Sequence, residues 1–108
     1  MSGGFKDREK GFESKFAHDA EMKFKVMNRR NKLLGLWAAE LLGKSGEAAQ
    51  TYAKEVVVAD FEEPGDEDVY RKVRGDLDPA KVSEQAIRGK MVELLDTAAQ
   101  QIETEAKA

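Results

Sequence analysis

The sequence predicts an all-α protein: a four-helix bundle with an extended, partly disordered N-terminal arm on its first helix. Apolar residues recur at helical spacings of three and four, and strand signals are nearly absent, since the β-branched run Val56-Val57-Val58 lies inside a helical pattern. The connections between the amphipathic stretches are short, which favours an antiparallel bundle. We expect a mobile arm at residues 1–18 and the bundle at residues 19–108.

The first helix is expected to begin between Phe5 and Asp19 and to end at Gly43, where a glycine supplies the left-handed backbone that stops a helix. In its front half the apolar residues form only a thin line within a charged sequence: Phe5, Phe12, Phe16, Ala20 and Phe24. From Leu33 to Leu42 the helix is apolar on most of its circumference and must be buried. The front half is therefore predicted to face a partner, and the back half to form core.

Two residues of the back half predict how it packs. Trp37 and the leucines around it are expected to form the centre of the bundle core. Gly35 costs about 1 kcal/mol relative to Ala in a helix interior, so something should compensate. We expect another helix to approach closely at Gly35.

The second helix is expected to start after Ser45, which is placed to cap it, and to end near Glu62, before Pro64-Gly65. Glu47 lies in its first turn, where a negative charge is favoured. The apolar face of this helix is formed by Ala49, Tyr52, Ala53, Val56 and Val57.

The third and fourth helices follow from capping signals. Asp66 is expected to cap a short helix whose inward residues are Val69, Tyr70, Val73 and Leu77. The order Asp78-Pro79 is typical of a helix start and predicts that the fourth helix opens there. Its apolar stripe consists of Val82, Ala86, Ile87, Met91, Leu94, Leu95, Ala98 and Ile102.

Composition excludes several classes of protein. The absence of cysteine rules out a disulfide framework and a Cys-type zinc site. No apolar stretch approaches the roughly eighteen residues of a membrane span, so we expect a cytoplasmic monomer without membrane insertion. Residues 1–32 carry nine Lys and Arg against five Asp and Glu, a net charge of +4, whereas residues 33–108 carry nine against sixteen, a net charge of −7. The N-terminal segment is thus a basic arm on an acidic body.

The sequence contains no group of residues in the arrangement that catalysis or metal binding requires. His18 is the single histidine and has no nucleophile or second ligand arranged near it, so we interpret it as a surface residue or partner contact. An EF-hand loop starting at Asp66 would need a ligand and a glycine where Tyr70 and Arg71 stand. Gly43-Lys44-Ser45 matches only the end of a P-loop, and we interpret it as a helix stop followed by a cap. We expect no enzyme activity, no metal and no required cofactor.

Two groups of residues are candidates for binding. Phe5, Phe12 and Phe16 are large aromatics on one face of a charged segment, as in helices that lie in a partner groove; the alternative is that they fold back onto the bundle. The basic residues Arg29, Arg30 and Lys32 form a candidate site for an anion or weakly bound nucleotide, since guanidinium groups bind phosphate. Nucleic-acid binding is not expected, because the body is acidic and no aromatic residues are interleaved with these cations.

Three stretches resemble a known family, the zeta subunits of alpha-proteobacterial F-type ATP synthases. The resemblance covers nearly the whole chain and its motifs are long. They are Phe12-Glu13-x-Lys15-Phe16-Ala17-His18-Asp19; Arg29-Arg30-Asn31-Lys32-Leu33-Leu34-Gly35-Leu36-Trp37-Ala38-Ala39; and Tyr52-Ala53-x-Glu55-Val56-Val57-x-Ala59-Asp60-Phe61-Glu62-x-Pro64-Gly65-Asp66-x-Asp68-Val69 with Arg71-Lys72-Val73.

The resemblance implies a four-helix bundle that inhibits ATP hydrolysis by the synthase, and no enzyme activity of its own. The arm would enter the interface between the catalytic alpha and beta subunits, with the gamma subunit as a further partner, as a functional counterpart of the mitochondrial inhibitor protein. The protein would then be cytoplasmic and associated with the membrane-bound synthase through its soluble head. In the arm, three aromatics would be buried anchors and four charged residues would set the register: Phe5, Phe12, Phe16, Arg8, Lys10, Glu13 and Lys15. The alternative function is a small nucleotide- or anion-binding helical regulatory protein.

Overall fold

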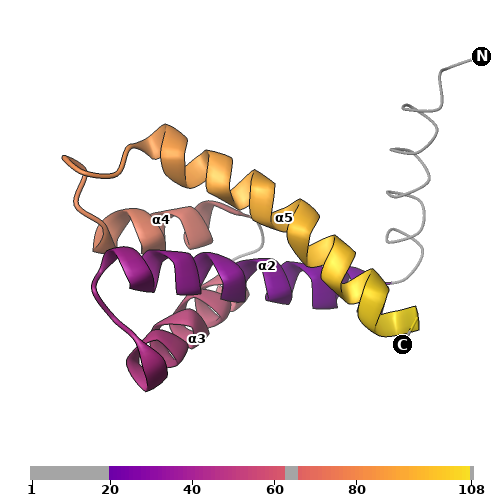
Figure 1. The fold of residues 1–108 in the computed structure, drawn as a ribbon. Helices are drawn as coiled ribbons and strands as arrows, with labels where there is room; N and C mark the ends of the chain where they lie inside the picture. Colours follow the sequence, from indigo (N-terminus) through magenta and orange to yellow (C-terminus); the bar gives the residue numbers. More distant parts are fainter. Residues whose placement is uncertain (1–19, 63–65, 108) are drawn as a thin grey trace, which may run out of the picture.

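The structure, a computed structural model, describes residues 20–62 and 66–107, and within them it contains helices and no strand. The predicted all-α, four-helix architecture is confirmed for this part of the chain, whereas the arm expected at residues 1–18 lies outside it. The helices are labelled as in Figure 1: α2 (Ala20–Leu41), α3 (Gly46–Glu62), α4 (Asp66–Asp76) and α5 (Glu84–Lys107).

Helix α2 is the central element. It contacts each of the other three helices, whereas α3 and α5 make no contact with each other. Helix α4 packs against α3, α5 and α2, and α5 crosses the full length of the bundle (Figure 1). The faces of α3 and α5 that point away from α2 are therefore separate surfaces of the molecule.

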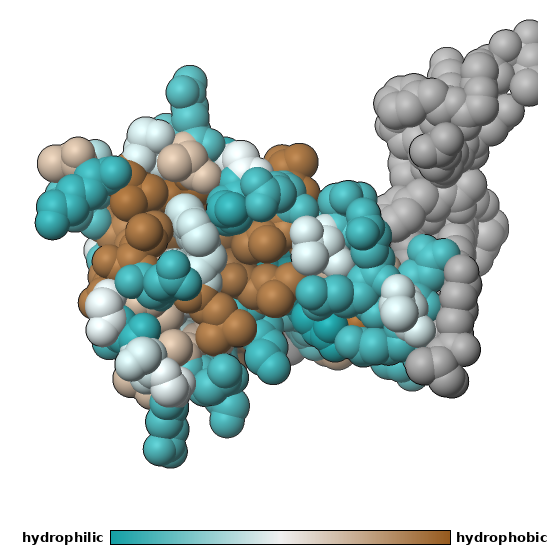
Figure 2. All heavy atoms as spheres, in the orientation of Figure 1, coloured by the Kyte–Doolittle hydropathy of each residue, from teal (hydrophilic) through white to brown (hydrophobic). Residues whose placement is uncertain are grey.

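Buried apolar residues form two clusters. The larger one joins all four helices and consists of Leu34, Ala38, Ala39, Tyr52, Val56, Val69, Tyr70, Val73, Leu77, Ile87 and Met91. The smaller one joins the first half of α2 to the second half of α5 through Val26, Ala98, Ala99 and Ile102. On the face that Figure 2 shows, hydrophobic residues gather over the part of the bundle near α4, and hydrophilic residues dominate toward the end of α5.

Trp37 is not the centre of the core, which corrects the prediction from sequence. The centre is formed by smaller side chains such as Leu34 and Ala38, both fully buried, while Trp37 is partly buried and packs against the larger cluster from its edge. Its ring is too large to be enclosed easily. The Lys90 Nζ lies 5.8 Å from the ring centroid, so a cation covers part of the ring.

Helix α2 stops at the predicted glycine. Gly43 has a φ of 78°. The Lys44 N–H donates to the Ala39 carbonyl at 2.8 Å, and the Gly43 N–H donates to the Glu40 carbonyl at 3.1 Å. This pair of bonds is a Schellman motif, which satisfies carbonyls left open at the helix end.

The close helix approach predicted at Gly35 is confirmed, and the neighbour is α3. A Cβ built on Gly35 would lie 2.6 Å from the Ala53 Cα and 3.2 Å from Val56 Cγ2. Real Cβ atoms do not approach a backbone atom so closely. Gly35 and Ala53 therefore set the distance between α2 and α3.

The prediction that the fourth helix opens at Asp78-Pro79 is wrong. The Asp78 Oδ1 accepts a hydrogen bond from the Ala80 N–H at 2.9 Å, but this capping closes a single turn. Helix α5 begins at Glu84, where the Ser83 Oγ accepts a hydrogen bond from the Ala86 N–H at 3.0 Å. Two capping signals lie close together here, and the second one starts the helix.

Candidate partner-binding site

The predicted partner-binding residues of the arm precede the described part of the chain. Nothing in the structure places them or brings them together, and their roles stay predictions. What the structure does describe is the segment that follows the arm, the first half of α2, and its attachment to the bundle. The residues concerned are Phe5, Arg8, Lys10, Phe12, Glu13, Lys15 and Phe16.

The first half of α2 is attached to α5 by the smaller apolar cluster. Val26 is buried against Ala98, Ala99 and Ile102, with Met22 and Leu33 beside it. Val26 was not among the core residues predicted from the sequence. The spacing of Met22, Val26 and Leu33, four and then seven residues, was the available signal for this stripe.

Arg29 strengthens this attachment. Its Nη1 donates to the Gln101 Oε1 at 2.7 Å, and its Nη2 donates to the Glu105 Oε1 at 2.9 Å. The hydrogen bond and positive charge of Arg29 hold the pKa of the Glu105 carboxyl below its usual value. The start of α2 is thus clamped to the last turns of α5 by polar as well as apolar contacts.

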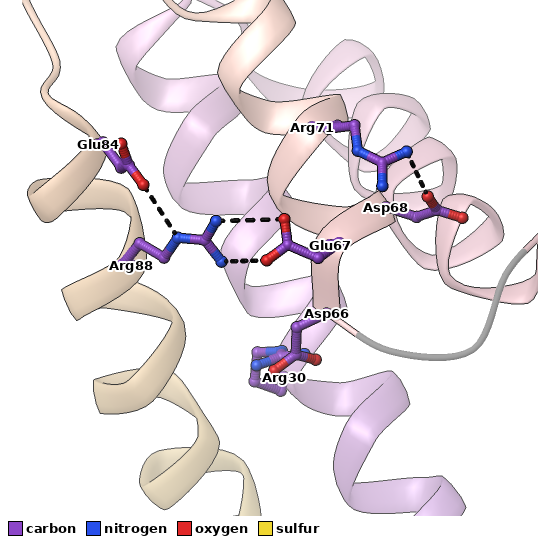
Figure 3. Close-up of polar contacts among 7 residues, drawn as sticks. All are labelled: Arg30, Asp66, Glu67, Asp68, Arg71, Glu84 and Arg88. Atoms are coloured by element: carbon purple, nitrogen blue, oxygen red, sulfur yellow. Dashed lines mark hydrogen bonds and ion pairs between the residues drawn. The ribbon is translucent and has the colours of Figure 1, made fainter.

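Arg30 ties α2 to two further helices from inside the protein. Its side chain is 1% exposed, and its Nη2 donates to the Asp66 Oδ1 at the start of α4 at 2.7 Å (Figure 3). The Nε donates to the Asn31 Oδ1 at 2.7 Å, and the Nη1 donates to the Met91 carbonyl of α5 at 3.4 Å. A buried arginine needs such partners, because an unpaired buried charge is strongly destabilising.

The structure does not gather Arg29, Arg30 and Lys32 into one exposed anion site. Arg30 is buried and its donors meet protein oxygens, while Arg29 is engaged with α5. Lys32 is exposed at a different place, beside the α3 residues Ala53 and Val57. These positions support structural roles for the two arginines.

The first half of α2 also has a face that does not pack on α5, and this face is exposed and charged. Lys25 pairs with Glu21 at 3.9 Å, as their spacing of four predicts. Phe24, the last residue of the thin apolar line predicted from the sequence, is 51% exposed. An exposed, large apolar side chain on a charged helix face is what we expect of the arm. Phe24 is the one residue of the apolar line whose exposure the structure describes.

Neither a cluster of metal-ligating side chains nor a helix of membrane-spanning character occurs in the described part of the chain. No group of three or more His, Cys, Asp or Glu side chains in residues 20–62 and 66–107 is placed to hold a metal ion. None of the helices from α2 to α5 is both long and apolar enough to cross a membrane.

Comparison with known proteins identifies the family. No curated protein matches the chain significantly. A protein solved by solution NMR is 56% identical, with a TM-score of 0.72, over 78% of this chain and 98% of that chain. The family described as ATPase inhibitor subunit zeta matches residues 1–101. The match includes both the arm and most of the bundle, so the chain belongs to the family of ATPase inhibitor zeta subunits.

Proposed function

We propose that this protein inhibits ATP hydrolysis by the F-type ATP synthase by inserting its arm, residues 1–18, into the interface between the catalytic alpha and beta subunits. The inserted arm blocks rotation in the hydrolysis direction. The protein acts as a non-catalytic monomer in the cytoplasm, on the soluble head of the membrane-bound synthase, with the gamma subunit as a further contact. It requires no cofactor.

The extent of the family match carries this proposal. The match begins at residue 1, whereas the buried apolar residues of the described part begin only at Val26. Within the described residues, the buried members of both apolar clusters lie between Val26 and Ile102. The arm belongs to the family pattern and precedes this described core, which supports assigning it to the partner.

The attachment of α2 suits an inhibitor that must resist a moving partner. Arg29 and Arg30 fasten the first half of α2, the segment that follows the arm, to α4 and α5, so a force on the arm would be passed to the whole bundle. The arm aromatics would be the desolvated anchors in the partner interface, and the arm charges would set register and association rate.

The alternative, a nucleotide- or anion-binding regulator using Arg29, Arg30 and Lys32, has less support. A phosphate would have to displace the Asp66 contact of a side chain that is 1% exposed. Saturable ligand-induced NMR shifts at Arg29, Arg30 and Lys32 would nevertheless favour it over the arm.

The test is hydrolysis by the cognate catalytic complex, titrated with intact protein and arm variants. Removing residues 1–18 should abolish inhibition. Phe12→Ala and Phe16→Ala should each weaken binding about thirty-fold, corresponding to about 2 kcal/mol for a buried anchor. Lys10→Ala and Lys15→Ala are the matched controls at the rim, and they should change mainly the association rate and its salt dependence. Full inhibition by the shortened protein would refute the proposal.

A further inference from the structure

Val58 is an exposed apolar residue in the second half of α3, between two hollows of the surface. Its side chain is 53% exposed. On one side lies a hollow of about 320 Å³ between α2 and α3, lined by Lys32, Gln50, Ala53, Lys54, Val57 and Val58. On the other side lies a hollow of about 660 Å³ between α3 and α4, whose lining includes Val58, Ala59 and Arg71.

The first hollow is a consequence of the helix crossing described above. Gly35 and Ala53 carry little or no side chain, so the two backbones meet closely and no large residue fills the groove beside them. Val57 and Val58 form its apolar wall. A side chain from outside could therefore pack against these valines without rearrangement of the helices.

The charged residues that line these hollows are four cations and two carboxylates, so the net charge is positive: Lys32, Lys54, Arg71 and Lys72 against Glu55 and Asp68. Lys32 and Lys54 are exposed, and neither forms an ion pair with any residue in the described part of the chain. Arg71 adds a third cation, which pairs with Asp68 at 3.1 Å and is still 65% exposed. Residues 33–108 carry a net charge of −7, so this cationic rim opposes the charge of the body around it.

We propose that this surface, the α3 face formed by Lys32, Lys54, Val57, Val58 and Arg71, is a second contact with the complex that the arm inhibits. It binds an acidic segment of that complex, with an apolar side chain packed on Val58 between carboxylates that meet Lys32 and Lys54. This inference rests on the proposed function and adds to it a docking contact made by the bundle.

Charge complementarity selects an acidic partner over a second copy of this chain. A symmetric dimer through the α3 face would place the same cations opposite each other, since a two-fold interface pairs one patch with itself. An acidic segment instead supplies the charges that Lys32 and Lys54 lack, which also speeds association.

The experiment uses the full chain and two pairs of matched variants. Val58→Glu places a negative charge on the α3 face, and Val92→Glu places the same charge on α5, at a valine that is 72% exposed on a helix that does not contact α3. Lys54→Glu is paired in the same way with Lys81→Glu in the exposed α4–α5 connection. Affinity for the cognate catalytic complex and inhibition at saturation are measured at two salt concentrations, with circular dichroism confirming the fold.

Val58→Glu should weaken binding at least ten-fold and Lys54→Glu about five-fold, within the range of interface substitutions. Lys54→Glu should also reduce the salt dependence of this affinity. The affinities of both controls should lie within two-fold of that of the original protein. Inhibition at saturation should remain complete in all four variants, because the arm is intact.

Equal binding by Val58→Glu and Val92→Glu would overturn the α3 contact and leave the arm proposal standing, since the arm variants test that separately. Self-association that Val58→Glu abolishes would assign the face to a second copy instead. Failure of the intact protein to bind the complex would overturn both proposals.

Discussion

At the scale of single residues, two glycines in helix interiors differ in what surrounds them. Gly35 lies against the α3 backbone, whereas nothing lies within 4 Å of a Cβ built on Gly89. Gly89→Ala should therefore stabilise the protein by about 1 kcal/mol, the difference in helix propensity. Gly35→Ala should destabilise it by about 1–3 kcal/mol, because α2 and α3 must move apart.

Urea unfolding of both glycine variants measures these free energies. The two substitutions are chemically identical, so the opposite signs isolate the effect of the helix crossing. A stabilising Gly35→Ala would show that the contact with Ala53 relaxes at little cost.

Asp60 predicts a pH dependence. Burial raises the pKa of its carboxyl above the ordinary 3.8, and the positive charge of Arg30 only partly opposes this. A raised folded-state pKa means that the folded protein holds this proton more tightly than the unfolded chain does. The Asp60 contribution to stability is therefore present below pH 3.8 and is lost as the pH rises through the folded-state pKa.

Asp60→Asn removes this titration. As the pH rises above 3.8, the original protein should lose stability that the variant keeps, so the free energy of unfolding of the variant should rise relative to that of the original protein. Thermal and urea unfolding of the two proteins between acidic and neutral pH measures the difference. A difference that stays constant with pH, or that falls, would contradict the assigned direction.

At the scale of elements, two of the three acidic residues in the first turn of α4 form different kinds of ion pair. Asp66 is bound to the buried Arg30, whereas Glu67 forms a bidentate pair with the exposed Arg88, at 2.9 and 3.3 Å (Figure 3). Asp66→Ala should cost about 2 kcal/mol, because it leaves a buried guanidinium without its carboxylate. Glu67→Ala should cost less than about 1 kcal/mol, as surface pairs do.

Both substitutions remove one negative charge from the same helix start, so their effects on the helix dipole are similar and the difference reports on the partners. Urea unfolding gives the two values. Equal losses would mean that Arg30 finds other partners or water when Asp66 is absent.

The elements also show which features a sequence can predict. The end of α2 was predictable because Gly43 and its hydrogen bonds are local. The start of α5 was not, since Asp78 and Ser83 both cap and only tertiary packing decides which turn continues. The Arg30–Asp66 pair spans 36 residues, so the basic run that suggested an anion site gave no sign that one of its members is buried.

At the scale of the whole molecule, the two apolar clusters have different places. The larger cluster holds all four helices together, and the smaller one holds the start of α2 on the end of α5. The second half of α5 therefore supports the segment from which the arm leaves. Gly35 indicated a helix neighbour from sequence alone, but which helix it meets, and that Val58 stays outside, follow only from the assembled bundle.

This arrangement predicts that the arm contributes little to stability. The buried apolar residues of the described part lie between Val26 and Ile102, so removing residues 1–18 should change the free energy of unfolding by less than about 0.5 kcal/mol, as surface changes do. Ile102→Ala, a single substitution in the smaller cluster, should cost about 2 kcal/mol or more, because it leaves a cavity. Urea unfolding, followed by circular dichroism, compares the two. A loss on shortening that matches that of Ile102→Ala would show that the arm packs on the bundle, and its aromatics would then be core residues and not anchors for a partner.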